Sequence, residues 1–589
     1  MILKYFRARD WAMLACAISL IVCSVYFELL IPEYMSEITY LLQQGETPDV
    51  VADYGVEMIL CACTALVLSM TASILAARVA SSLCWILREK QFARIEEWSR
   101  QDIDSFSVAS LITRSTNDTY HIQLLVARVI TNLTRAPVMA VWAIFKITSS
   151  AFEWTLTTVI AMLILLSVMV WLMMKGVPYI RKMQWFVDAV NGETKEELEG
   201  MRTIRAYNAE ERQNKAFDEA SDALLGNAVS AVKVMTPMKP LASSMMSFLT
   251  LAIYWVGAAI IMGAEGDNTY QMQLFSDMIV FTSYATIVLS AVMLASGIAR
   301  EVPDLIVSAH RVEEVIEHES PIVDGPLTAE SAEAPGEVVF DHVSFEYPGT
   351  GHEILHDVSF SVGKGETLAI IGPTASGKST LVNLMARMYD ATSGTVSVGG
   401  RDVREYEIDE LTGMLGYVPQ TAIIFTGTML ENICYGASEG KTEEDALRAV
   451  SIAQLDDLVA KMPDGIHSDV SQHGWNLSGG QKQRLAIARA VCKDPPIYIF
   501  DDTFSALDSR TDRNLREALA RETGDATKII VAQRVGTIMD ADRIVVLDHG
   551  SVVGSGRHEE LMRTCGLYRE IAESQLEAQR WRRRSRRAC

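Results

Sequence analysis

Six long runs of apolar residues precede residue 300, and they limit the possible fold more than any other feature of the sequence. Each run has about the 17–25 residues that a helix needs to cross the hydrocarbon core of a bilayer. Together they predict an α-helical transmembrane domain over residues 1–317. The predicted spans lie near residues 11–31, 55–82, 136–152, 155–175, 241–263 and 275–298.

The segments between the runs alternate in charge. The residues before the first run and the segments 88–135 and 175–239 are rich in Lys and Arg. The loops 32–54, 149–154 and 264–274 contain neither. Because basic loops remain on the cytoplasmic side, this pattern predicts a multi-pass protein with both termini in the cytoplasm and three external loops.

Several charged residues lie within the predicted spans, among them Glu28, Arg78, Lys146 and Asp277. A charge in hydrocarbon is costly and commonly functional. Long basic side chains near the end of a span can instead extend to the interface, and we favour this interpretation for Lys146 and Arg78. The roles of Glu28, Lys146 and Asp277 stay open at the level of sequence.

A second, soluble part follows the apolar runs. Mean hydropathy is positive at +0.16 although 21% of the residues are charged, which indicates an apolar part joined to a soluble one. Residues 318–336 have the proline, glycine and acidic composition of a linker. We predict an α/β domain over residues 337–575 and a solvated basic tail over residues 576–589, which holds six arginines between 580 and 587. The net charge of −22 argues against a nucleic-acid partner.

A glycine-rich loop in the soluble part predicts a site for nucleotide phosphates. Residues 372–379 match G-x-x-x-x-G-K-[ST] fully, follow an apolar strand at 368–372 and open a predicted helix. Such a loop turns backbone N–H groups toward a phosphate, and the helix N-terminus adds partial positive charge. Lys378 is expected to reach the β- and γ-phosphates, and Ser379 to hold Mg²⁺. The predicted loop residues are Gly372, Pro373, Thr374, Ala375, Ser376, Gly377, Lys378, Ser379 and Thr380.

A second apolar strand, at residues 497–500, ends in Asp501 and Asp502. In a protein with a phosphate loop, an acid in this position can contact the Mg²⁺ shell, so we predict ATP and Mg²⁺ as ligands. Two short strands are also predicted, at Val338–Phe340 and Val343–Phe345.

Between these motifs, Leu477-Ser-Gly-Gly-Gln481 opens the run that ends at Arg489. Beside a phosphate loop, this resembles the signature motif of ATP-binding cassette (ABC) transporters, and the resemblance covers essentially the whole chain. The membrane half resembles the exporter-type (type IV), domain-swapped six-helix fold. Residues 109–118 and 200–210 are similar to the two intracellular loops of heterodimeric bacterial multidrug exporters. The resemblance implies a half-transporter of the bacterial cell membrane with a cytoplasmic ATPase domain.

Further roles are implied only by this resemblance. Tyr347 matches the aromatic residue that stacks on adenine, and Gln420 matches the glutamine that contacts Mg²⁺ and senses the membrane domain. The signature completes the ATP site of the opposite subunit, where Ser478 and Gly480 contact the γ-phosphate. The signature residues are Leu477, Ser478, Gly479, Gly480 and Gln481, and the loop that joins the two sites matches Ser505, Ala506, Leu507 and Asp508.

Three positions depart from the family pattern. Asp502 stands where a glutamate usually polarises water, and Gln533 stands where a histidine usually acts as a switch. Asp is one methylene shorter than Glu, and in-line attack tolerates little misplacement. Gln carries no positive charge, and Gln472 also replaces the usual Glu of symmetric exporters. Either main change alone also fits neutral drift, but the combination resembles the degenerate subunit of an asymmetric exporter.

We therefore expect an ATPase with low activity at its own site, paired with a second half-transporter that carries the intact Glu and His. The weak site would be built on Lys378 and Asp502, and Ser478 would complete the active one. The expected function is export of amphipathic small molecules or lipids. Three alternatives stay open: an importer built on the exporter fold, as for siderophores; a slow homodimer; and an ATP-sensing regulatory subunit. The substrate is not defined by the sequence.

Overall fold

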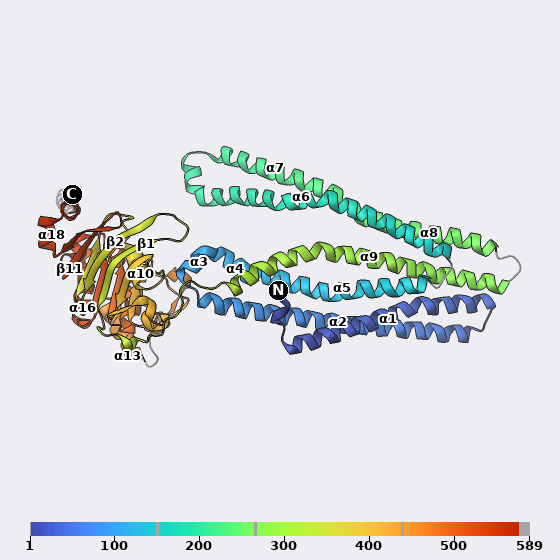
Figure 1. Cartoon of the computed structure of the whole chain (residues 1–589), viewed down its shortest axis with the longest axis horizontal. Helices are drawn as coiled ribbons and strands as arrows, with labels where there is room; N and C mark the ends of the chain where they lie inside the picture. The colour runs from blue at the N-terminus through green and yellow to red at the C-terminus, as the bar shows by residue number, and fades with distance from the viewer. Residues whose placement is uncertain (1, 149–151, 264–267, 438–440, 576–589) are drawn as a thin grey trace. The chain divides into compact units, whose positions relative to one another are not determined.

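The computed structural model describes residues 2–148, 152–263, 268–437 and 441–575 (Figure 1). The chain forms two compact units. The helical unit comprises Met1–Ile95 and Ala109–His318, and the α/β unit comprises Glu96–Val108 and Glu319–Cys589. A short early segment of the chain is therefore part of the later unit.

Six segments of the described chain are long and apolar enough to cross a membrane. The helices that form them are, in order, α1 (Ala8–Gln44); α2 (Pro48–Glu96); α4 (Val108–Thr113) with the π-helix η2 (Arg114–Asp118) and α5 (Thr119–Thr148); α6 (Phe152–Ala206); α7 (Glu210–Met235) together with α8 (Met238–Gly263); and α9 (Asn268–Glu317).

These helices extend beyond the apolar runs that predicted them. The first external loop, expected over 32–54, spans only residues 45–47, and α9 is already helical from Asn268 within the loop expected over 264–274. The reason is that only the part of a helix in hydrocarbon needs to be apolar. Residues 149–151 of the remaining external loop lie outside the described part of the chain.

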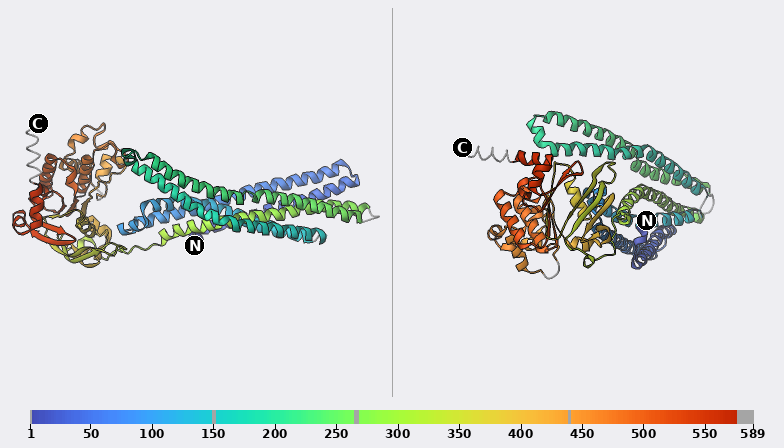
Figure 2. Two further views of the ribbon diagram at one scale, coloured as in Figure 1. Left: turned by 90° about the horizontal axis from the view of Figure 1, so that it is seen from above. Right: turned by 60° about the vertical axis from the view of Figure 1, so that its left-hand side comes forward.

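A hairpin of α6 and α7 separates from the other helices at its far end. The figures show α6 and α7 running side by side, and their connecting tip lies away from α1, α2, α5 and α9 (Figures 1 and 2). Tyr207 lies at this tip with 80% of its surface exposed. Near the other end, Trp154 packs on Phe281 with ring centroids 5.4 Å apart, and both are buried.

Polar side chains link α1 to α5 and α9. Arg135 pairs with Glu28 at 2.5 Å, and Lys146 pairs with Glu33. The Tyr284 hydroxyl donates a 2.9 Å hydrogen bond to the Leu29 carbonyl oxygen. Lys146 therefore has a carboxylate partner on α1, and its extension to the interface, favoured from sequence, is not needed to explain it. Arg78 and Asp277 are exposed.

Two sheets form the centre of the α/β unit. The six-stranded sheet has the order β12-β11-β3-β10-β9-β6, parallel except for β12, and the antiparallel four-stranded sheet has the order β2-β1-β4-β5. A short pair joins β7 to β8. The strands are β1 (Val338–Glu346), β2 (Glu353–Val362), β3 (Thr367–Ile371), β4 (Ser393–Val398), β5 (Arg401–Asp402), β6 (Leu415–Val418), β7 (Gly427–Thr428), β8 (Asp469–Val470), β9 (Ile497–Asp501), β10 (Thr527–Val531), β11 (Arg543–Asp548) and β12 (Ser551–Gly556).

The two short strands predicted at Val338–Phe340 and Val343–Phe345 are in fact one strand, β1. Its pairing with β2 shifts register between Phe340 and Val343, and His342 has a φ of 48°. A bulge of this kind adds a residue without ending the strand, and it breaks the apolar alternation that the sequence displays.

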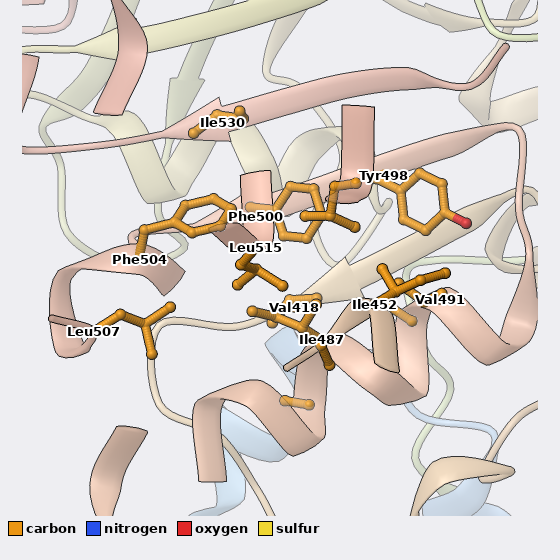
Figure 3. Close-up of a cluster of buried hydrophobic side chains, with 14 of the residues drawn as sticks. Val418, Ile452, Ile487, Val491, Tyr498, Phe500, Phe504, Leu507, Leu515 and Ile530 are labelled. Carbon is orange, nitrogen blue, oxygen red and sulfur yellow. The ribbon is translucent and has the colours of Figure 1, made fainter. Parts of the chain in front are cut away.

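Helices cover the parallel sheet, and its strands are buried on both faces. Ile497 and Ile499 of β9 face the core shared with the antiparallel sheet, whereas Tyr498 and Phe500 face a second core among the helices. Figure 3 shows this second core, where Phe500 lies near Ile487 and Leu515. The helices are α3 (Arg100–Phe106), α10 (Lys378–Met385), α11 (Ile408–Gly413), α12 (Met429–Ile433), α13 (Glu443–Ile452), α14 (Asp456–Val459), α15 (Gly479–Lys493), α16 (Ser509–Glu522), α17 (Val535–Ile538) and α18 (His558–Thr564), with a last helix over residues 566–575.

Candidate nucleotide-binding site

The phosphate loop connects β3 to α10, as its sequence predicts. A Cβ on Gly372 would lie 2.1 Å from the Leu547 carbonyl oxygen, so no larger residue fits there. Gly377 caps α10 with a φ of +98°, a left-handed conformation that favours glycine. The loop therefore takes the tight path in which the free N–H groups of the first turn of α10 can receive an anion.

Lys378 folds back over this loop. Its ammonium group donates to the carbonyl oxygens of Gly372 at 3.0 Å and Pro373 at 2.6 Å. Burial lowers the pKa of Lys378, and the nearby carboxylates of Asp502 and Asp501 oppose that shift. A buried cation held by neutral carbonyl groups is suited to gain a phosphate as a partner.

Ser379 and Asp501 meet at the carboxyl edge of the parallel sheet. The Ser379 hydroxyl donates to Asp501 Oδ1 at 3.3 Å, since β3 and β9 flank β10 in parallel register. Burial raises the pKa of Asp501, and the Ser379 hydrogen bond opposes the rise. A hydroxyl and a carboxylate are hard oxygen donors of the kind that suit Mg²⁺, so the residues present fit this ion.

Three sequence-predicted residues gather around one carboxylate oxygen. Gln533 Nε2 donates to Asp502 Oδ2 at 2.8 Å, and Gln420 Nε2 donates to the same oxygen at 3.3 Å. Asp502 is only 8% exposed and adopts a left-handed backbone with a φ of 46°. Asp502 is thus held between two neutral amides directly after β9.

Tyr347 lies at the side of the loop. Its hydroxyl is 3.2 Å from Thr380 Oγ1, and its ring packs edge-on against Phe345 and Tyr389 with centroids 4.8 and 5.1 Å away. The ring is half-buried. It is therefore held rigidly beside the helix that the phosphate loop opens.

The signature motif begins α15. Ser478 is the N-cap, and its backbone N–H donates to Gln481 Oε1 at 2.7 Å while the Gln481 N–H donates back to Ser478 Oγ at 3.4 Å. Ser478 is exposed. Within the described residues, no hydrogen bond joins the signature to residues 372–380 of the same chain. The signature is thus ordered and open to a second molecule.

The loop after Asp502 connects these two regions. Ser505 Oγ donates to the Asp502 carbonyl oxygen at 2.8 Å, and Asp508 caps α16. The Ala506 carbonyl oxygen would lie 3.3 Å from a Cβ on Gly480, which places the loop against the signature. Sequence reasoning missed Arg534, which donates from Nη2 to the Ser505 carbonyl oxygen at 3.0 Å; no motif marks this residue.

A further contact with the ATP-binding part of the chain lies on α3. The Tyr389 hydroxyl donates to Asp104 Oδ2 at 2.7 Å, and the Ser320 hydroxyl donates to Asp102 Oδ2 at 2.6 Å. A capping box between Ser99 and Asp102 begins the helix. The early segment Glu96–Val108 is therefore anchored on the ATP-binding part of the chain.

Comparison with known proteins identifies both parts of the chain. The family model described as "ABC transporter transmembrane region" matches residues 14–292, and the model described as "ABC transporter" matches residues 355–505.

Whole relatives and a solved structure agree with these matches. The chain is 37% identical over 493 residues to an uncharacterized ABC transporter ATP-binding protein of Mycobacterium tuberculosis, covering 83% of each. It is 33% identical over 392 residues to YgaD of Bacillus subtilis, covering 65% of this chain and 64% of YgaD, a protein whose name assigns it provisionally to multidrug export. A bacterial Atm1-family ABC exporter with ATP bound shares the fold, with a TM-score of 0.79, 24% identity and coverage of 96% of this chain and 98% of the exporter.

The fused arrangement of one transmembrane region and one ATP-binding domain is that of a half-transporter, which works as a dimer with another ABC subunit. The chain therefore belongs to the ABC transporter family, as a membrane-embedded half-transporter of the exporter fold whose ATPase activity drives transport across the membrane.

Proposed function

We propose that this chain is the degenerate-site half of a heterodimeric exporter and that ATP bound at its own phosphate loop is hydrolysed slowly. The observation that carries this proposal is the double engagement of Asp502 by Gln533 and Gln420. Because both amides donate to the same oxygen of Asp502, that oxygen already accepts two hydrogen bonds and is less available to orient an attacking water. The carboxylate also sits one methylene short of the glutamate position, where small misplacements slow in-line attack.

Gln533 contributes a second defect. One of the two N–H donors of its amide goes to Asp502 at 2.8 Å, and the amide carries no charge for a developing γ-phosphate. Electrostatic stabilisation supplies most of the catalysis in phosphoryl transfer, so a neutral group there is a direct loss. The site therefore favours binding of ATP over its turnover.

The other site residues keep their binding roles in this proposal. Residues 372–380 hold the phosphates, and Tyr347 packs on the adenine. When bound, Mg²⁺ would supply positive charge that offsets the charge of the phosphates. The residues that would hold it are Ser379, Gln420 and Asp501.

The residues expected in the partner subunit follow from which site residues this chain retains and which it lacks. The signature is intact and Ser478 is exposed, so it can complete a site on a second subunit. In a homodimer both sites would combine Asp502 with Gln533, and neither would have a full base. We therefore infer a partner half-transporter with Glu and His at the corresponding positions.

Export of amphipathic small molecules or lipids is the transport direction and substrate class that we favour. The exporter fold of the solved relative and the provisional multidrug name of YgaD support it. The basic segments 88–135 and 175–239 support cytoplasmic termini and a cytoplasmic ATPase domain in a bacterial cell membrane. An importer on the same fold is the second candidate, and efflux against uptake in oriented vesicles distinguishes the two.

The decisive test of the degenerate site is the ATPase rate of the purified full-length chain in lipid nanodiscs. We expect a rate far below the enzyme median of about 10 s⁻¹. Co-reconstitution with the partner subunit should restore turnover, and a Ser478→Ala variant of this chain should then abolish most of it. Ordinary turnover by the chain alone would refute the proposal.

A further inference from the structure

Gln575 reaches the switch position from the last described turn of the C-terminal helix. This helix packs through Tyr568, which is fully buried, and Ala572, which is 1% exposed. The spacing of residues 568, 572 and 575 places all three on one helical face. The inward direction of the Gln575 side chain is therefore set by the packing of the helix, and the His558 ring nitrogen Nδ1 lies 2.7 Å from the Tyr568 hydroxyl.

The Gln575 amide bonds to the two peptide units that flank Arg534. Its Nε2 donates to the Gln533 carbonyl oxygen at 2.7 Å, and its Oε1 accepts from the Val535 N–H at 2.8 Å. Strand β10 ends at Val531, so sheet pairing no longer holds the chain here. One side chain thus replaces a strand neighbour at the point where the main chain leaves the sheet.

The opposite side of the same short segment faces the nucleotide site. The Gln533 side chain donates to Asp502 at 2.8 Å, and the Arg534 side chain donates to the Ser505 carbonyl oxygen at 3.0 Å. The Asp502 carboxylate also interacts electrostatically with the Lys378 ammonium group. The orientation of the Gln533 side chain therefore depends on the main chain of residues 533–535. Gln575 holds this main chain from the side opposite the nucleotide site.

We propose that Gln575 is a positioning residue for this nucleotide site: by holding the peptide of residue 533, it keeps the Gln533 amide between Asp502 and the γ-phosphate. The C-terminal helix thereby sets how strongly the site distinguishes a triphosphate from a diphosphate. This rests on the proposed placement of ATP on residues 372–380 and of its γ-phosphate beside Asp502. Gln575 lies some 40 positions beyond the last motif of the nucleotide site, at Gln533.

The experiment measures the affinities of AMP-PNP and ADP for the full-length chain in nanodiscs, by competition with a fluorescent ATP analogue. We expect Gln575→Ala to weaken AMP-PNP binding about three- to tenfold, as the loss of one hydrogen bond from the Gln533 amide to the γ-phosphate implies, and to leave ADP binding unchanged. In a Gln533→Ala background, Gln575→Ala should change neither affinity further. Glu573→Ala, at an exposed position of the same helix, is the matched control and should have no effect.

Three results would overturn the inference. Equal loss of AMP-PNP and ADP affinity, or a fall in unfolding temperature that accounts for both, would reduce Gln575 to a structural role. Additive effects of Gln575→Ala and Gln533→Ala would show that the two residues act separately. An unchanged preference for AMP-PNP over ADP in Gln575→Ala would show that the two hydrogen bonds of Gln575 do not influence how the site distinguishes the nucleotides. AMP-PNP is not hydrolysed, so a fast ATPase would refute the degenerate site without affecting this measurement.

Discussion

The side-chain nitrogen of Gln533 lies 2.8 Å from Oδ2 of Asp502 and joins the ends of two neighbouring parallel strands, β10 and β9. Asp502 follows β9 directly, and Gln533 follows β10 by two residues. The two departures from the family pattern therefore act on each other. In the family pattern a positively charged histidine lies beside the longer glutamate, so each has a partner of opposite charge. Here the neutral Gln533 lies beside the shorter Asp502, and this charge pairing is lost.

Restoring both residues should raise hydrolysis at this chain's own site. In the assembled transporter we expect Asp502→Glu with Gln533→His to increase the rate at that site by at least about tenfold, since a general base typically contributes 10²–10⁴-fold. The site-specific rate is measured in a complex whose other site is inactivated by Ser478→Ala. The same double change combined with Lys378→Ala is the control and should stay inactive. A flat rate would place the dominant defect elsewhere, with Gln472 the next residue to change.

Two substitutions in this chain should have unequal effects on turnover. A lost hydrogen bond to a charged group costs about 1.5–3 kcal/mol, or roughly ten- to a hundredfold. For Ser478→Ala the loss falls on the transition state at the partner's site, so kcat should drop. For Lys378→Ala the loss falls on ATP retention at the weak site. The ATP concentration needed for half-maximal turnover should therefore rise, and kcat should fall less than in Ser478→Ala. Steady-state kinetics of the complex measure both, and the reverse ranking would mean that the two sites are wrongly assigned.

The tip of the α6–α7 hairpin should contact the partner subunit. Tyr207 is 80% exposed within this chain, although a large aromatic ring favours burial in a core or an interface. We expect Tyr207→Cys to form crosslinks between subunits. A Tyr389→Cys and Asp104→Cys pair, joined by a bifunctional thiol reagent, is the within-chain control, because the Tyr389 hydroxyl and Asp104 Oδ2 lie 2.7 Å apart in one chain. Crosslinks from residue 207 confined to one chain would exclude the swapped arrangement.

Tyr389→Phe should weaken the attachment of α3. The phenol donates to the Asp104 carboxylate at 2.7 Å, and its removal should cost about 1.5–3 kcal/mol and reduce substrate-stimulated ATPase activity while basal activity persists. Burial raises the pKa of Tyr389 above its usual 10.0, with the Asp104 hydrogen bond as a further cause. The phenol is thus a protonated donor throughout the neutral range, and the stability it contributes is lost only as pH rises above 10. The effect of Tyr389→Phe should therefore be equal at pH 6 and pH 9 in denaturation assays; a difference would mean that another group titrates at this contact.

The parts of this protein that could be predicted from sequence are those in which backbone or lipid restricts the choice of residue. Hydrocarbon requires apolar residues, so the six membrane helices could be predicted. Helix α6 continues to Ala206 through water, where many residue types are compatible with a helix, so its end could not be predicted. The phosphate loop was visible because Gly372 and Gly377 have no substitute. Gln575 was not visible, because its two hydrogen bonds depend on how a distant helix packs.

The discontinuity of the α/β unit has a consequence for biosynthesis. Asp104 leaves the ribosome 285 residues before its hydrogen-bond partner Tyr389. At about 5–20 residues per second, α3 waits roughly 15–60 s before the surface that receives it exists. During that interval the membrane helices between them are being inserted. Docking of α3 can thus occur only after the membrane helices between Asp104 and Tyr389 have been synthesised.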